Sequence, residues 1–252
     1  MSSSAAFYFI LGTPGSGRRG IVFDLIENGL APNDPALVLL AASESADAAD
    51  EKLAARANTE VRRWSWNGTE LPDIENLPAT GAIFFIAESR GDPMTQLESL
   101  KPWLVRHHLE LARIFTVVDC QLAEKQAPLA AWFDACIYFS DVVFLTKREG
   151  VANKWLSAFI RRYEDLFYPA HFIQVKKGGL ANPAIVLDPT PRRVAQYFEE
   201  FEDLSGIEIE TDDDEEDAEA DEDAPKPEPY FERNRSGRRV KELPDVRNYL
   251  PN

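Results

Sequence analysis

The chain has 252 residues, of which 44% are hydrophobic and 11% aromatic, so most of it is expected to fold around a substantial core. No apolar run reaches the ~18 residues that a membrane-spanning helix needs, so no membrane association is expected. Two cysteines exclude a disulfide scaffold and fit a reducing, cytoplasmic setting. The net charge of −16 argues against nucleic-acid binding, because a net-acidic body repels phosphodiester chains.

Residues 1–206 alternate between short apolar runs and helical patterns. The runs predict strands that are covered on both faces: Ala5–Leu11, Ala36–Ala41, Glu60–Trp66, Ala82–Ala87, Arg113–Asp119, Val142–Thr146 and His171–Val175. The helical patterns are Arg19–Leu30, Ala46–Ala57, Met94–Leu109, Leu122–Asp134, Val151–Leu166 and Pro191–Leu204. This alternation predicts one α/β domain over 1–206, with a mostly parallel sheet flanked by helices.

The composition changes near residue 207. Residues 208–223 hold twelve carboxylates and no basic side chain, so they cannot bury enough apolar surface to fold. Residues 224–252 hold seven Lys/Arg against four Asp/Glu, with scattered aromatic residues. We predict a disordered tail over 207–252. The alternative is that its last part is a short motif that docks on a partner or back on the domain.

A glycine loop follows the first predicted strand, and a helix begins directly after it. The loop reads GTPGSGRRG from Gly12 to Gly20. In this context main-chain N–H groups and a helix N-terminus hold phosphate. From Gly12 the spacing is that of a P-loop, and from Gly15 it is the G-x-G-x-x-G of dinucleotide-binding folds. A tight turn without a ligand is the third interpretation.

The P-loop interpretation has a chemical defect. A P-loop places Lys for the β/γ-phosphates and then Ser or Thr for Mg²⁺. Arg18 keeps the charge in a different shape, and Arg19 removes the hydroxyl ligand. Mg²⁺ binding is therefore left open, and we expect Arg19 to take the space of the metal and hydrolysis to be weak or absent.

The dinucleotide interpretation keeps the glycines Gly15, Gly17 and Gly20. It also requires an acidic residue near the end of the second strand. Glu44 lies close to that point. A Rossmann-type NAD(P)-binding protein is therefore an alternative.

Two later strands also end in polar residues. Glu88 follows the Ala82–Ala87 run, at the edge where α/β sheets bind ligands, and is the candidate catalytic residue for orienting water or a metal. Its alternative role is a helix N-cap, for which Asp92 is the better candidate. The sequence T-K-R-E at 146–149 is similar to the [NT]-K-x-D with which GTPases hold guanine, with Glu149 in place of Asp. The alternative there is an ordinary polar strand end.

The order of these motifs is that of P-loop GTPases. Over roughly residues 5–175 the chain resembles the CobW-like P-loop GTPases, relatives of the urease- and hydrogenase-maturation GTPases. The resemblance is carried by ESRGDP at 88–93, TVVDC at 116–120 and CIYFSDVVFLTKREGV at 136–151, where Asp141 precedes the strand at the family's offset. It implies a P-loop NTPase-like domain with GTP as ligand, coupled to delivery of a metal or cofactor.

The resemblance also implies roles by position. Phosphates would be contacted by the loop, the metal and γ-phosphate would lie near Glu88 and Gly91, and the base would lie near the 146–149 motif. The nucleotide-binding residues implied are Gly12, Gly15, Ser16, Gly17, Arg18, Arg19, Gly91, Thr146, Lys147 and Glu149.

Three departures from the family decide the predicted function. Both loop residues after Gly17 are arginine, the base-reading residue is Glu149, and the family's cysteine-rich metal motif is absent from 60–70. No metal site is therefore predicted. We predict a degenerate GTP-binding protein, a pseudo-GTPase that acts as a nucleotide-sensing or scaffolding module with an unknown protein partner reached through the tail. A slow, active GTPase that assists metal or cofactor delivery, the NAD(P)-binding protein and a ligand-free interaction protein are the alternatives.

Overall fold

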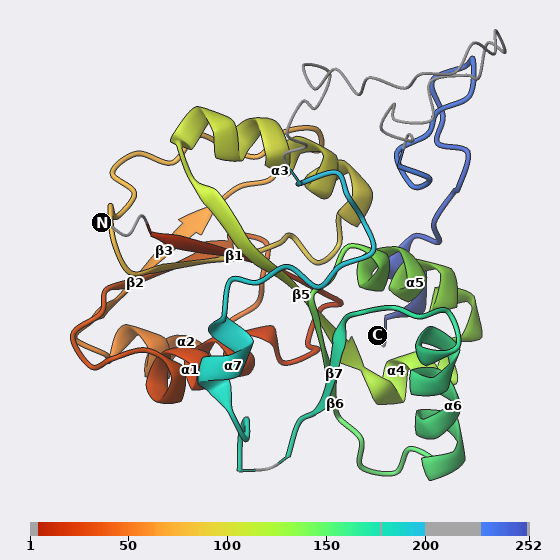
Figure 1. Cartoon of the computed structure of the whole chain (residues 1–252), viewed down its shortest axis with the longest axis horizontal. Coiled ribbons are helices and arrows are strands. Elements are labelled where there is room, and N and C mark those ends of the chain that lie inside the picture. The colour runs from red at the N-terminus through yellow and green to blue at the C-terminus, as the bar shows by residue number, and fades with distance from the viewer. Residues whose placement is uncertain (1–4, 177, 200–227, 251–252) are drawn as a thin grey trace, which may run out of the picture.

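The computed structural model describes residues 5–176, 178–199 and 228–250 (Figure 1). Its centre is a seven-stranded sheet in the order β3-β2-β4-β1-β5-β6-β7, in which all neighbouring strands pair in parallel. The strands are β1 Ala6–Gly12, β2 Ala36–Ala41, β3 Thr59–Trp64, β4 Ala82–Ile86, β5 Glu110–Asp119, β6 Val142–Thr146 and β7 His171–Gln174. The predicted parallel α/β sheet is thereby confirmed.

Helices cover both faces of the sheet, so successive side chains of each central strand enter different cores. In β1, Phe7 and Phe9 belong to one core, whereas Tyr8 and Ile10 belong to the other. One face is covered by α3 Pro93–His107, α5 Ala130–Tyr138 and α6 Asn153–Glu164. The other is covered by α1 Arg18–Gly29, α2 Ala48–Ala54 and α7 Pro183–Leu187. This two-sided burial explains why the strands are continuous apolar runs.

Two predicted helices differ from the structure. The expected helix Leu122–Asp134 is divided into α4 Cys120–Lys125, a 3₁₀ turn η1 Ala127–Leu129 and α5, because Pro128 interrupts the helical hydrogen bonding. Residues 191–199 of the expected helix Pro191–Leu204 form bends and turns, and 200–204 lie outside the described residues. The main-chain N–H groups there bind other elements, with Val194 and Ala195 donating to the carbonyl of Tyr138.

The segment 228–250, called the C-terminal segment below, packs against the domain. Phe231 stacks on Phe139 with ring centroids 4.9 Å apart, and Val246, in the 3₁₀ turn η3 Val246–Tyr249, is 2% exposed. Arg239 pairs with Glu98 of α3 at 2.6 Å. Over 228–250 the structure therefore differs from the disordered tail expected from 207 and matches the alternative of docking back on the domain. The acidic run 208–223 lies outside the described residues.

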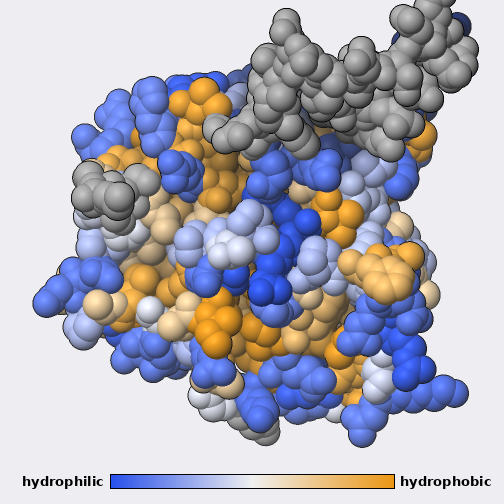
Figure 2. Space-filling view, in the orientation of Figure 1, coloured by the Kyte–Doolittle hydropathy of each residue, from blue (hydrophilic) through white to orange (hydrophobic). Residues whose placement is uncertain are grey.

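The visible surface of the molecule in Figure 2 is a mixture of hydrophilic and apolar residues, and apolar residues gather around α7. A groove of about 220 Å³ lies there, between β7 and α7, lined by Phe172, Ile173 and Ile185 among others. Among the described residues, no helix has the length and apolar character needed to cross a bilayer.

Candidate nucleotide site

The glycine loop connects the carboxyl end of β1 to the first turn of α1. Gly15 and Gly17 have φ of 71° and 92°, a left-handed conformation that glycine adopts without steric cost. Gly17 is the N-cap of α1 and supplies no capping side chain, so the first amide groups of α1 have no partner within the helix. Position 12 has no room for a side chain, because a Cβ on Gly12 would lie 2.7 Å from the carbonyl oxygen of Val117. The loop therefore combines left-handed glycines with a helix N-terminus that has no side-chain cap, two features that anion-binding loops use.

Two hydroxyl groups of the loop are buried without protein partners. The Oγ1 of Thr13 and the Oγ of Ser16 make no hydrogen bond to the described residues, and both residues are 0% exposed. Buried hydroxyls are normally satisfied, because leaving one unpaired costs about 1–3 kcal/mol. Both groups thus lack a hydrogen-bond partner among the described residues, and a ligand could reach them only if the loop opened.

The end of β6 is brought directly against this loop. The hydroxyl of Thr146 has two carbonyl oxygens within hydrogen-bond distance, that of Ser16 at 2.8 Å and that of Val118 at 2.9 Å, which share its single proton. The ammonium of Lys147 lies 2.8 Å from a carboxylate oxygen of Asp119 and 3.8 Å from where a Cβ on Gly15 would be. Thr146 and Lys147, the first two residues of the 146–149 motif, therefore lie against the glycine loop, although more than a hundred residues separate them from it in the sequence.

Replacing Thr146 with valine is expected to lower the free energy of unfolding by about 1–2 kcal/mol, because the hydroxyl proton shared by two buried carbonyl groups is lost while the side-chain shape is kept. Urea unfolding followed by circular dichroism measures the change. Thr69→Val is the matched control, since Thr69 is exposed and bonds only to neighbouring Asn67. Equal effects of the two substitutions would show that Thr146 does not hold the loop.

Arg18, at the position of the P-loop lysine, is buried and already hydrogen-bonded to other groups of the protein. Its guanidinium donates to the carbonyl oxygen of Ala87 and to a carboxylate oxygen of Glu44, each at 2.5 Å, and the side chains of the pair are 4% exposed. Burial lowers the pKa of Arg18, and the charge of Glu44 opposes this shift. Burial also raises the pKa of Glu44, but attraction to Arg18 and hydrogen bonding outweigh it, so that pKa lies below its ordinary value of 4.5. The pair links α1 to the ends of β2 and β4.

Arg19 points toward α2 rather than into the loop. Both oxygens of Asp50 accept from its guanidinium at 2.8 Å, and the carbonyl oxygen of Ser45 accepts at 2.7 Å. Asp50 is also part of the capping box of α2. The expectation that Arg19 takes the space of the metal ion therefore differs from the arrangement observed.

Glu88 is held at the end of β4 by its main chain and its side chain. The side-chain amide of Gln96, which is 0% exposed, accepts from the N–H of Glu88 at 2.8 Å and donates to its carbonyl oxygen at 2.9 Å. The carboxylate accepts from the hydroxyl of Ser43 at 2.9 Å and from the N–H of Arg90 at 3.1 Å. The N-cap of α3 is Asp92, as the sequence indicated.

Of the remaining predicted residues, Gly91 lies beside Glu88, whereas the side chain of Glu149 lies at the surface. Gly91 lies against Glu88, whose carboxylate oxygen is 2.9 Å from where a Cβ on Gly91 would be. The side chain of Glu149 is exposed, and only its carbonyl oxygen is bound, by the amide of Gln121 at 2.6 Å. Sequence reasoning missed Asp50 and Gln96, and it gave Glu44 a different role. A buried glutamine inside the apolar face of α3 was the available signal for Gln96.

The charged side chains of the site indicate which parts of a nucleotide it can bind. The cations Arg18, Arg19 and Lys147 each have a carboxylate partner, so a phosphate would meet loop amides and hydroxyls and little unpaired positive charge. No hydroxyl follows Gly17 to ligate Mg²⁺, and the guanidinium in that position is bound to Asp50. The residues present therefore fit a phosphate group and do not fit a P-loop Mg²⁺ ion. Across the described part of the chain, no cluster of three His, Cys, Asp or Glu side chains is arranged for a metal.

The sheet order disfavours the dinucleotide interpretation. Rossmann folds place their first two strands side by side, so that an acid at the end of the second reaches the ribose. Here β4 separates β1 from β2. Glu44, the acid required, is instead bonded to Arg18.

Comparison with known proteins gave matches among solved structures only. No protein-family model matches the chain, and no curated protein matches it. The zinc-bound YjiA GTPase from E. coli aligns at 13% identity and a TM-score of 0.41, over 75% of this chain and 67% of that chain. A zinc-bound triple mutant of YjiA GTPase aligns at 13% identity and a TM-score of 0.42, over 76% of this chain and 67% of that chain. These similarities assign no activity to the chain.

Proposed function

We propose that this chain is a CobW-like GTP-binding protein that does not hydrolyse GTP appreciably and acts as a nucleotide-sensing or scaffolding module. One observation carries this proposal: Arg18, which replaces the P-loop lysine, is buried and bonded to Glu44 and to Ala87. A guanidinium bound in this way cannot reach the β/γ-phosphates without breaking its hydrogen bond to the buried carboxylate of Glu44, which would keep only the longer contact to Arg19 at 3.6 Å, and this loss is unfavourable.

Retention of nucleotide binding is supported by the loop itself. The left-handed glycines, the unpartnered hydroxyls of Thr13 and Ser16 and the free first turn of α1 are arranged for a phosphate. Loss of hydrolysis is supported by Arg19, which removes the Mg²⁺ ligand, since metal stabilises the charge that develops during phosphoryl transfer. GTP is therefore expected to bind without metal, with the 146–149 motif next to the base.

The experiment is a titration of the purified full chain with fluorescent GTP, in Mg²⁺ and in EDTA. We expect saturable binding whose dissociation constant changes by less than about twofold between the two conditions, because no metal ligand is offered. ATP and NADH analogues are expected to bind more weakly than GTP. Phosphate release should equal that of a protein-free blank. Loss of binding in EDTA, or turnover that disappears in Glu88→Gln, would support the slow, active GTPase instead.

A matched pair of variants tests whether GTP binds at the glycine loop. Gly17 has φ of 92°, a Cβ added there would meet nothing within 4 Å, and both Asn and Asp tolerate left-handed φ. Gly17→Asp puts a negative charge at the cradle, whereas Gly17→Asn has the same shape without the charge. We expect the Asp variant to bind GTP at least about tenfold more weakly than the Asn variant, through charge repulsion. Equal affinities would place the nucleotide elsewhere.

A further inference from the structure

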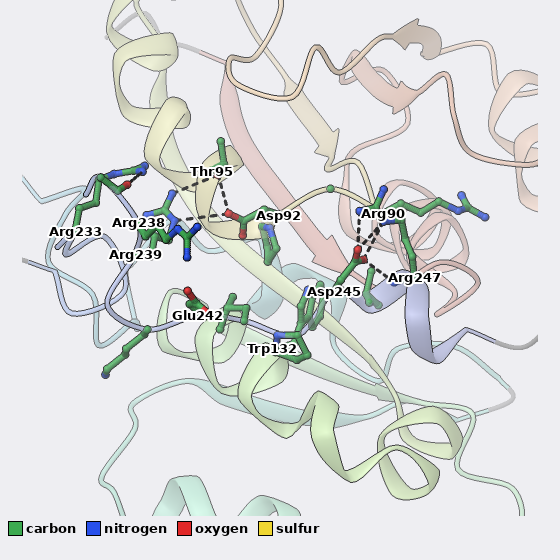
Figure 3. A pocket seen from close by; sticks show the side chains of 17 residues that line it. Arg90, Asp92, Thr95, Trp132, Arg233, Arg238, Arg239, Glu242, Asp245 and Arg247 are labelled. Carbon is green, nitrogen blue, oxygen red and sulfur yellow. Dashed lines mark hydrogen bonds and ion pairs between the residues drawn. The ribbon is translucent and has the colours of Figure 1, made fainter. Parts of the chain in front are cut away.

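A cleft of about 470 Å³ lies between the loop after β4 and the C-terminal segment, apart from the glycine loop (Figure 3). One wall is formed by residues 90–93, with Thr95 and Trp132. The other is formed by Arg233 and residues 237–239 and 241–247. The cleft exists because the C-terminal segment packs on the domain.

The lining of this cleft is strongly basic, although the whole chain carries a net charge of −16. Six of its residues are basic and three are acidic: Arg90, Arg233, Arg238, Arg239, Lys241 and Arg247 against Asp92, Glu242 and Asp245. Figure 3 shows Arg239 beside Asp92 and Thr95, and Arg247 beside Asp245. Within the described residues, no carboxylate lies within 4.0 Å of the side-chain nitrogens of Arg90, Arg238 or Lys241. Arg90 and Arg238 are thus left for a ligand, and the ammonium of Lys241 lies over the ring of Tyr230, 4.5 Å from its centroid.

The basic wall is rigidly built. The side-chain oxygen of Asn234 accepts from the N–H groups of Ser236 and Arg238, and the N–H of Asn234 donates to the carbonyl oxygen of Arg238 at 2.8 Å. Gly237, with φ of 80°, completes this tight turn. Stacking of Phe231 on Phe139 and burial of Val246 attach the segment to the core. Because the C-terminal segment is already held in place, a ligand that binds here would lose little free energy to ordering it.

We propose that this cleft binds an acidic peptide segment of a partner protein. Guanidinium groups form paired hydrogen bonds with carboxylates, and Trp132, Leu243 and Pro244 offer apolar contacts between them. A short peptide fits because it can contact the basic lining of the cleft alone, whereas a nucleic acid would also meet the acidic remainder of the chain. This proposal does not rest on the proposed nucleotide binding, because no residue of the glycine loop lines the cleft.

The test measures fluorescence anisotropy of a fluorescein-labelled twelve-residue Asp/Glu peptide with the full chain. We expect saturable binding that weakens as salt is raised from about 50 to 300 mM. The double variant Arg238→Glu/Lys241→Glu should weaken binding at least about tenfold, because two attractive contacts become repulsive. The control Lys154→Glu/Arg161→Glu makes the same charge change on exposed positions of α6 and should alter binding less than about twofold. GTP binding should be unchanged in all variants.

Three outcomes would overturn the proposal. Equal losses in the two double variants would mean that only overall charge matters. Tighter binding of a single-stranded RNA dodecamer than of the peptide, with the same dependence on Arg238 and Lys241, would make the ligand a nucleic acid. Peptide binding that appears only after the carboxylates of 208–223 are changed to amides would make the chain's own acidic run the occupant.

Discussion

Replacing Glu44 with alanine is expected to lower the free energy of unfolding by about 3–5 kcal/mol, the range found when one partner of a buried ion pair is removed. The side chains of Glu44 and Arg18 are both 4% exposed, so the substitution leaves a buried guanidinium with only the carbonyl oxygen of Ala87. Urea unfolding at neutral pH, followed by circular dichroism, measures the effect.

The matched control is Glu60→Ala, which breaks the surface pair between Glu60 and Arg62, with side chains 60% and 29% exposed. A change below about 1 kcal/mol is expected there, since exposed pairs contribute little. The double variant Arg18→Met/Glu44→Leu should recover most of the stability lost in Glu44→Ala, because no buried charge remains. If Glu44→Ala were as mild as the control, the pair would not support the site as described.

The loss of stability caused by replacing Glu44 should become smaller as the pH falls. The pKa of Glu44 is lowered in the folded chain, so the unfolded chain takes up the proton first as the pH falls. The stability difference between the natural chain and Glu44→Gln should be full at neutral pH and should shrink as the pH falls below 4.5, the ordinary pKa of the group. A difference that grew on acidification would contradict the lowered pKa.

Ending the chain at residue 227 is expected to lower the free energy of unfolding by at least about 3 kcal/mol, because a buried valine and two aromatic side chains leave the core surface. Val246 is 2% exposed, Phe231 stacks on Phe139, and Tyr230 lies 5.1 Å from the ring of Tyr138. The thermal midpoint and the urea midpoint should both fall.

Deletion of 208–223 alone is the control for that truncation. It removes twelve carboxylates but leaves the whole C-terminal segment. We expect its urea midpoint to stay close to that of the full chain. Equal midpoints for the full chain and the chain ending at 227 would mean that the C-terminal segment does not stabilise the domain.

Much of the fold was predictable because its signals are local. Runs such as Ala36–Ala41 and Val142–Thr146 are covered on both faces, so they contain no polar interruption, and their predicted bounds equal those of β2 and β6. The glycine loop was equally visible, since its shape depends on residues that can adopt positive φ. The contact of Thr146 with the loop was not predicted, since the sequence analysis placed the 146–149 motif near the base.

The parts that were not predicted depend on contacts between distant residues. Arg18 meets Glu44 only because the sheet order brings the ends of β2 and β4 next to α1. The C-terminal segment has its aromatic residues among charges and prolines, without a helical or strand period, and so resembles a disordered sequence. Residues 191–199 do not form the predicted helix, because main-chain N–H groups there donate instead to the carbonyl oxygen of Tyr138 and to the buried carboxylate of Asp141.

The two hydrogen bonds between Gln96 and the main chain of Glu88 make the end of β4 and the helix α3 a single mechanical unit. Helix α3 also carries Glu98, which anchors the C-terminal segment through Arg233 and Arg239. A displacement of the main chain at Glu88 would therefore act on α3 through these two hydrogen bonds, and through Glu98 on one wall of the basic cleft.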